Sequence, residues 1–133
     1  MNTQMAQTIL VIDDNVQITR LLRGILRQEG YRVIISHEPV LCQELVAREA
    51  PDLVIVDICM PEMDGWEVCH RIRKMRDVPI LVLTVLAENR YAERTMAAGA
   101  NAHMSKPFAI SALLEQVRSL LHEHIQRLDV YQP

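Results

Sequence analysis

The feature that most constrains the fold of this chain is a short apolar run, Leu53 to Val56, that ends directly in a carboxylate, Asp57. The run shows no alternation of polar and apolar positions, which is typical of a strand buried on both faces of a parallel sheet. Asp57 would then lie at the carboxyl end of the strand, where open parallel sheets bind their ligands. Pro61 and the pair Asp64-Gly65 predict a loop after it. Taken alone, Asp57 could equally be a solvated strand end, so the rest of the chain decides its meaning.

Strand-like and helix-like segments alternate along the whole chain. Apolar β-branched runs predict the strands, and apolar residues at helical spacing predict the helices between them. We expect strands over residues 8–12, 32–36, 53–56, 80–84 and 102–105. We expect helices from Val16 to before Gly30, from Pro39 to about Glu49, over 64–74, from Glu88 to Ala98 and from about Ala109 to Ile125. The apolar residues of the second helix should face inward, namely Val40, Leu41, Leu45 and Val46. The fourth helix, which is rich in polar residues, should be weakly anchored.

This order of segments predicts an α/β fold. Consecutive parallel strands must be joined by right-handed helical crossovers, and these place helices on both faces of the sheet. With the strand order 2-1-3-4-5, which doubly wound sheets adopt, four strand ends meet at one edge. They would bring together Asp13, Asp14, Asp57, Thr84 and Lys106.

Length and composition exclude several classes of protein. The 133 residues suffice for one domain, which we place at 1–126, followed by a tail or the start of a linker at 127–133. The net charge of −3 and the lack of a basic stripe argue against direct binding of nucleic acid. No apolar run is long enough to cross a membrane, and residues 1–7 lack a signal-peptide pattern. Three cysteines without zinc-site spacing favour a reducing compartment, here the cytoplasm.

The predicted cluster of carboxylates requires a cation. Asp13, Asp14 and Asp57 would repel one another, and Mg²⁺ or Mn²⁺ bound to their oxygens removes the conflict. Asp57 can then attack phosphorus as a nucleophile and form an aspartyl phosphate. The metal and Lys106 would neutralise charge, and the Thr84 hydroxyl would donate a hydrogen bond to a phosphoryl oxygen. Two alternatives stay open here: Asp13 or Asp14 could serve only to cap the first helix, and Thr84 could be only a strand-end hydroxyl.

Five motifs follow one another along the chain. They are Asp13-Asp14, the block Asp57-x-x-Met60-Pro61-x-Met63-Asp64-Gly65, Leu83-Thr84, Ala98-Gly99-Ala100 and Lys106-Pro107-Phe108. Over residues 8–125 the chain thereby resembles the receiver domain of bacterial two-component response regulators. The resemblance implies a flavodoxin-like (βα)5 three-layer sandwich and a cis peptide bond between Lys106 and Pro107. It also implies phosphorylation of Asp57 by a sensor histidine kinase or a phosphotransfer protein. The implied metal ligands are Asp13, Asp14, Asp57 and the backbone carbonyl of Cys59.

The chain departs from this family at two positions that bear on switching. The residue after the switch hydroxyl of Thr84 is usually small, but here it is Val85, which could crowd the phosphoryl group. An aromatic residue usually stands three positions before the lysine, where this chain has His103. We expect Thr84 and His103 to be the switch residues. The alternative for His103 is an ordinary edge-strand histidine.

The leading hypothesis is a phosphorylation-activated receiver that catalyses only its own phosphorylation and dephosphorylation. It would control an output domain or partner protein through the surface of its fourth helix, fifth strand and fifth helix. One alternative is a metal-dependent phosphatase or phosphotransferase acting on an external substrate, although the short loops leave no room for a cap. Another is a pseudo-receiver that binds partners without phosphorylation, although it should have lost an acidic or lysine position.

The last predicted helix bears on the oligomeric state. Ala112 and Gln116 stand where receivers that drive winged-helix DNA-binding domains typically carry an acidic and a basic residue. The usual ion pairs across a dimer therefore cannot all form, and such pairs fix register and partner choice. We expect a monomer or a weak, phosphorylation-dependent dimer.

Overall fold

The computed structural model describes residues 6–86 and 89–130, including the side chains of 6–86 and 91–126. The strands are β1 (Thr8–Ile12), β2 (Arg32–Ser36), β3 (Leu53–Val56), β4 (Ile80–Thr84) and β5 (Ala102–Ser105). The helices are α1 (Val16–Gln28), the 3₁₀ helix η1 (Pro39–Leu41), α2 (Cys42–Glu49), α3 (Gly65–Arg73), α4 (Asn89–Ala97) and α5 (Ile110–Val130). All five strands have the bounds that the sequence predicts.

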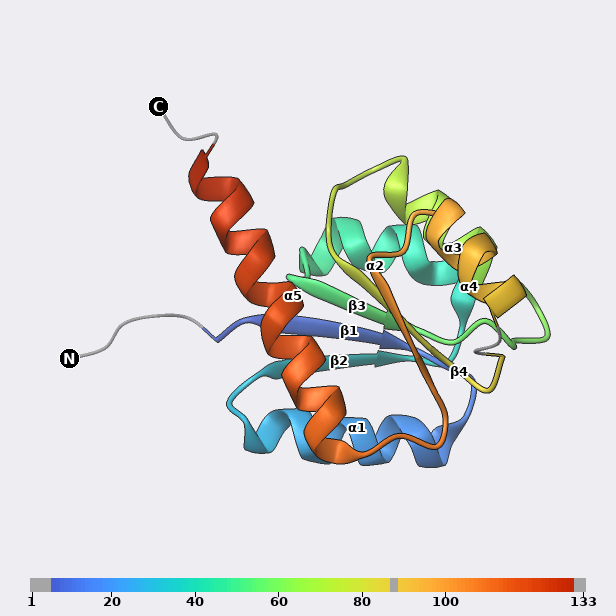
Figure 1. Ribbon diagram of the computed structural model, residues 1–133, viewed down its shortest axis with the longest axis horizontal. Coiled ribbons are helices and arrows are strands. Elements are labelled where there is room, and N and C mark those ends of the chain that lie inside the picture. The colour runs from blue at the N-terminus through green and yellow to red at the C-terminus, as the bar shows by residue number, and fades with distance from the viewer. Residues whose placement is uncertain (1–5, 87–88, 131–133) are drawn as a thin grey trace.

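The strands form one parallel sheet in the order β2-β1-β3-β4-β5, which is the predicted order. Helices α1 and α5 cover one face of this sheet, and α2, α3 and α4 lie on the other (Figure 1). In the register of the two central strands, Ile12 of β1 pairs with Val56 of β3. The residues that follow, Asp13 and Asp57, therefore leave the sheet at the same level. This is the flavodoxin-like three-layer sandwich that the resemblance implied.

The sheet separates two apolar cores. Because successive side chains of a strand point to opposite faces, Leu10 packs toward α2 and α3, while Ile9 and Val11 pack toward α1 and α5. The unbroken apolar runs are explained by this burial on both faces. Full burial of one Leu or Ile side chain contributes about 1.5–3 kcal/mol, so these runs are the main source of the sheet's stability.

The predicted second helix differs from the structure at its start. Residues 39–41 form the separate turn η1, and α2 begins only at Cys42. The expectation that Val40 faces inward is wrong, since its side chain is 49% exposed. A 3₁₀ turn has three residues per turn instead of 3.6, which shifts Val40 away from the buried face of the helix that follows. Leu45 and Val46 are buried as expected.

The last helix is longer than predicted, since α5 continues to Val130 instead of ending near Ile125. It therefore runs past the predicted boundary between a domain at 1–126 and a tail at 127–133, and that division stays a prediction. The predicted start of the fourth helix, Glu88, lies outside the described residues. Within the described part of the chain, no helix is both long and apolar enough to span a membrane.

Candidate functional site

The ends of β1 and β3 bring three carboxylates together. The backbone N–H of Asp57 donates to the carbonyl of Ile12 over 3.1 Å, which holds the two strand ends side by side. Carboxylate oxygens of Asp13, Asp14 and Asp57 lie within 4.8 Å of one another. Asp13 and Asp57 are buried, whereas Asp14 is exposed. The structure thus assembles the three acidic residues that the sequence singled out.

Lys106 reaches the same cluster from the end of β5. Its Nζ lies 2.7 Å from Oδ2 of Asp13 and 3.3 Å from Oδ2 of Asp57. Its backbone N–H donates to the carbonyl of Thr84 over 2.9 Å, which fixes the start of the side chain at the sheet edge. The peptide bond from Lys106 to Pro107 is cis, as the resemblance implied. One ammonium group therefore bridges two buried carboxylates.

The charge balance of this cluster fits a divalent cation. Burial raises the pKa of the Asp13 carboxyl above its ordinary value, while hydrogen bonds from Lys106 and from the backbone N–H of Asn15 act in the opposite direction. When all three carboxylates are ionised, they carry −3 and Lys106 carries +1, which leaves −2. Mg²⁺ prefers carboxylate oxygens of this kind, and Mn²⁺ accepts them too. Asp13, Asp14 and Asp57 could therefore hold either ion.

Thr84 ends β4 at the same edge and is 1% exposed. Its hydroxyl oxygen accepts a hydrogen bond from the N–H of Leu86 over 3.2 Å. The same oxygen lies 4.0 Å from Sγ of Cys59. Val85, by contrast, is 65% exposed, and its crowding of a phosphoryl group stays a prediction.

Cys59 lies between Asp57 and Thr84. Its backbone N–H donates to Oδ1 of Asp57 over 3.3 Å, so the carboxylate of Asp57 is held at one oxygen by Cys59 and at the other by Lys106. The Cys59 side chain is exposed. The metal contact expected from its backbone carbonyl stays a prediction.

The loop after Asp57 is closed by Gly65, whose N–H donates to the carbonyl of Ile58 over 3.0 Å. A Cβ at this position would lie 2.7 Å from Cα of Ile58 and would also collide with the carbonyl oxygen of Asp57. Only glycine fits here without movement of the backbone. The sequence predicts Gly65 only as part of a turn, because the local sequence carries no signal for this close approach to the backbone of Asp57 and Ile58.

Helix α1 is capped by Asn15 and not by Asp14. The side-chain oxygen of Asn15 accepts a hydrogen bond from the N–H of Ile18 over 3.1 Å. The alternative in which Asp14 serves only as the helix cap is therefore wrong. A signal for the true cap was present, because asparagine directly before the first apolar residue of a helix is a favoured N-cap.

His103 lies on the edge strand of the sheet. It is half-buried on β5, opposite Val82 of β4. Together with Phe108 and Ala112 it lines a hollow of about 440 Å³. Its role as a switch residue stays a prediction.

The three cysteines are all free thiols. Cys42 and Cys69 are buried in the core between the sheet and α2 and α3, and burial raises the pKa of Cys69 to about 12. The pKa of Cys42 is raised for the same reason. Both are therefore packing residues, whereas Cys59 lies at the site.

The chain is similar to known response regulators. The family model described as the response regulator receiver domain matches residues 9–118. The response regulator MprA of Mycobacterium ulcerans (strain Agy99) is 41% identical over 120 residues, which cover 88% of this chain and 51% of MprA. MprA of Mycobacterium leprae (strain TN) is 41% identical over 116 residues, or 85% of this chain and 50% of MprA. The chain thus spans about half the length of the curated relatives it matches.

Solved structures are similar over nearly their whole length. The CheY-like response regulator receiver domain protein of Methanospirillum hungatei JF-1 has a TM-score of 0.88 and 28% identity, covering 92% of this chain and 99% of that one. The BeF3-activated N-terminal receiver domain of Klebsiella pneumoniae RstA has a TM-score of 0.83 and 28% identity, covering 86% and 98%. From the extent of the family match and the shared fold, with the acidic cluster at its carboxyl edge, we conclude that the chain belongs to the response regulator receiver domain family of two-component signalling.

Proposed function

We propose that this chain is a phosphorylation-activated receiver in which Asp57 accepts a phosphoryl group from a phosphohistidine of a sensor histidine kinase or phosphotransfer protein. The observation that supports it most is Lys106, whose ammonium lies between Asp13 and Asp57 in an otherwise acidic site. A fixed positive charge beside the nucleophile stabilises the charge of an arriving phosphoryl group. A pseudo-receiver would have lost one of these residues, and none is lost.

The transfer needs one nucleophile and charge neutralisation. A carboxylate oxygen of Asp57 attacks phosphorus, the bond from phosphorus to the imidazole nitrogen breaks, and that nitrogen keeps the electron pair. The divalent metal, when bound, supplies positive charge to the phosphoryl oxygens. The Lys106 ammonium pairs with another oxygen of the phosphoryl group, and the Thr84 hydroxyl turns to donate a hydrogen bond to a phosphoryl oxygen. In dephosphorylation, water attacks phosphorus, the bond from phosphorus to the Asp57 oxygen breaks, inorganic phosphate leaves and the Asp57 carboxylate is restored.

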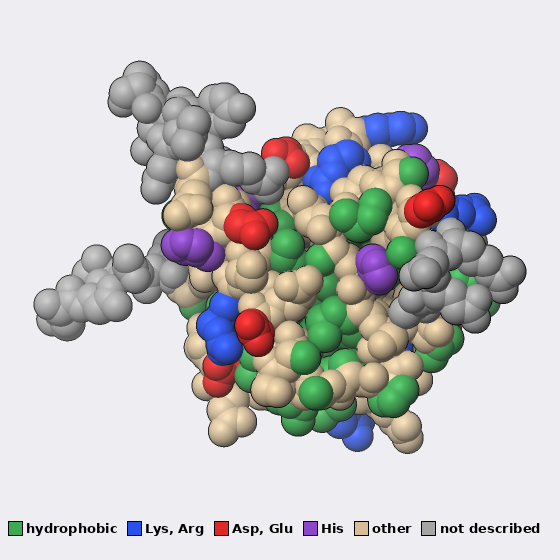
Figure 2. Space-filling view, viewed as in Figure 1, with side chains coloured by type: hydrophobic (Ala, Val, Ile, Leu, Met, Phe, Trp, Pro, Cys, Tyr) green, Lys and Arg blue, Asp and Glu red, His purple; other side chains and the backbone are tan. Residues whose placement is uncertain are grey.

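We infer that the output surface is the face formed by α4, β5 and α5, and that Thr84 and His103 take part in switching it. Viewed as in Figure 1, where α5 lies in front of the sheet, Figure 2 shows that hydrophobic and other side chains that are neither acidic nor Lys or Arg occupy the middle of this side. Ile110 and Ala112 of α5 are exposed there. Such a surface suits an output domain or a partner protein in the cytoplasm better than nucleic acid, which requires a basic surface.

The proposal is tested by transfer from a small phosphodonor. Incubation with acetyl phosphate and Mg²⁺ should add one phosphoryl group to the chain, measured as intact mass, and a chelator should prevent the reaction. Asp57→Asn should remain unmodified under the same conditions. Equal labelling of the variant, or labelling that persists without a divalent metal, would contradict the proposal.

The metal site has a test of its own. Asp14→Ala should lower the affinity for Mg²⁺ by roughly tenfold or more, because even partners outside the first ligand shell change metal affinity by about 10–100-fold. Glu44→Ala, which removes an exposed carboxylate on α2, is the matched control for the change in net charge. Titration calorimetry measures both. An unchanged affinity in Asp14→Ala would remove that residue from the metal site.

A further inference from the structure

Helix α4 has few apolar anchors to the rest of the molecule. Of its side chains from 91 to 97, only that of Thr95 is fully buried, and Met96 is 46% exposed. The sequence predicted such weak anchoring from the polar composition of this segment. A helix with little apolar burial depends on specific contacts for its position.

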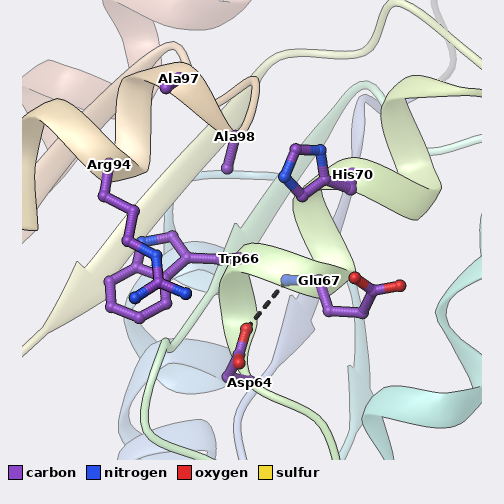
Figure 3. A pocket seen from close by; sticks show the side chains of 7 residues that line it. All are labelled: Asp64, Trp66, Glu67, His70, Arg94, Ala97 and Ala98. Atoms are coloured by element: carbon purple, nitrogen blue, oxygen red, sulfur yellow. Dashed lines mark hydrogen bonds between the residues drawn. The ribbon is translucent and has the colours of Figure 1, made fainter.

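Three such contacts converge on one side chain of α3, that of Trp66. The indole Nε1 donates a buried hydrogen bond to Oγ1 of Thr95 over 3.0 Å. The ring of Tyr91 stacks on the indole with centroids 6.1 Å apart and planes at 19°. The guanidinium carbon of Arg94 lies 3.7 Å from the centroid of the indole ring. Figure 3 shows Arg94 reaching from α4 across the face of Trp66.

Trp66 is in turn fixed to the loop that carries Asp57. It directly follows Gly65, whose N–H is bonded to the carbonyl of Ile58 and whose Cα leaves no room for a side chain. The start of α3 is therefore packed against the backbone of Asp57 and Ile58. Trp66, the α3 residue that contacts α4, therefore cannot move independently of the loop that follows Asp57.

Leu86, which precedes α4 in the chain, is bonded to Thr84 instead. The Thr84 hydroxyl oxygen accepts a hydrogen bond from the N–H of Leu86, and Leu86 packs against the same apolar core as Trp66 and Tyr91. If the Thr84 hydroxyl turns toward a phosphoryl group on Asp57, its bond to Leu86 changes, and the entry to α4 is displaced. Trp66 contacts α4 at residues 91–95, whereas Thr84 is linked to the chain just before this helix.

We propose that Trp66 is a positioning residue that holds α4 in its unphosphorylated place, and that a phosphoryl group on Asp57 releases α4 from Trp66. The inference rests on the proposed phosphorylation of Asp57. It supplies a link from the site to the output face that does not pass through His103.

The chain contains one tryptophan, so its fluorescence reports on this contact alone. Trp66 is 9% exposed, and a groove of about 340 Å³ lined by Arg94, His70 and Ala97 runs beside it. Acrylamide should therefore quench Trp66 poorly while Arg94 and Tyr91 cover the ring. After addition of Mg²⁺ and beryllofluoride, whose tetrahedral shape and charge imitate a phosphoryl group, the quenching constant should rise about twofold or more. Its emission should shift to longer wavelength, and Asp57→Asn should show neither change.

Variants of Thr95 test the hydrogen bond directly. Thr95→Val removes the acceptor at nearly constant volume, so the backbone amides of α4 should exchange about fivefold faster in the free protein. Thr95→Ser keeps a hydroxyl and should behave like the parent chain. Trp66→Phe, which keeps a stacked ring but loses the N–H, should accelerate the same amides by a similar factor. Unchanged exchange in α1 shows that the fold is intact in each variant.

The outcomes separate the two proposals. Binding of beryllofluoride is followed independently by ¹⁹F NMR. If it binds and α4 exchange changes while the quenching of Trp66 does not, the role of Trp66 is overturned and the receiver function stands. Equal α4 exchange in Thr95→Val and Thr95→Ser also overturns it. If beryllofluoride fails to bind in the presence of Mg²⁺, the proposed function fails and this inference fails with it.

Discussion

The carboxylate of Asp57 is positioned before any ligand arrives. Cys59 donates to one of its oxygens and Lys106 to the other, so as the proposed nucleophile this carboxylate would lose little further freedom on reaction. The sequence could predict the acidic and lysine positions because each follows a strand directly. It could not predict that Lys106 lies closer to Asp13 than to Asp57, since that depends on the reach of one flexible side chain.

The lifetime of the phosphoryl group depends on the side chains beside the path of the attacking water. We expect Cys59 and Leu86 to flank that path, and neither orients water well, because a thiol is a weak hydrogen-bond partner and leucine has none. Loss of phosphate should therefore be slow. Cys59→Asn combined with Leu86→Glu should accelerate it about tenfold or more, since a positioned polar group aids proton transfer.

The measurement is the decay of the phosphorylated mass after the phosphodonor is removed. Cys59→Ala, which removes the thiol without adding a polar group, is the control and should decay like the parent chain. An unchanged rate in the double variant would show that water orientation at these two positions does not limit hydrolysis.

The elements differ in how well the sequence predicts them. Strands buried on both faces leave unbroken apolar runs, and all five were predicted with correct bounds. The helices were predicted less well where the backbone forms a 3₁₀ turn instead of an α-helix. This happens at Pro39–Leu41, where the turn η1 leaves Val40 exposed. The contact of Trp66 with α4 could not be predicted either, because a lone tryptophan in a helix is usually read as a core residue.

Gly65 provides a test of how α3 is joined to the site. Gly65→Ala forces a Cβ against the backbone of Asp57 and Ile58, and overpacking of this kind costs about 1–3 kcal/mol of the free energy of unfolding. Gly24→Ala is the matched control, because a Cβ at Gly24 in α1 meets nothing within 4 Å. That change should stabilise the chain by about 0.5–1 kcal/mol. Urea unfolding measures both, and equal stability of the two variants would contradict the close approach at Gly65.

At the scale of the whole molecule, the sheet order puts the proposed phosphorylation site and the proposed output surface next to each other. Thr84 and Lys106 end the strands β4 and β5, and β5 is the edge strand of the proposed output face. The alternation of segments predicted a parallel sheet, and its strand order was predicted as the one that doubly wound folds and the resembled family adopt. The output partner could not be predicted, because its surface is not encoded in this chain.

The side chains of that face lead us to a prediction of the oligomeric state. Ala112 and Gln116 cannot form ion pairs across a dimer, and the exposed apolar side chains of Met96 and Ile110 offer little that fixes register. Sedimentation at micromolar concentration should find a monomer in the free protein and at most a weak dimer with beryllofluoride and Mg²⁺ bound. A tight two-fold dimer in both states, built on α4 and α5, would be the contrary result.

The most direct measurement locates the phosphoryl group itself. An aspartyl phosphate is an acyl phosphate, and borohydride reduces it to homoserine while phosphate leaves, so the modified residue keeps a permanent change in mass. After treatment with acetyl phosphate and Mg²⁺, peptide mass spectrometry should find homoserine at position 57 and at no other aspartate. Homoserine at a different position, or none in a sample that binds Mg²⁺, would contradict the assignment of Asp57 as the phosphoacceptor.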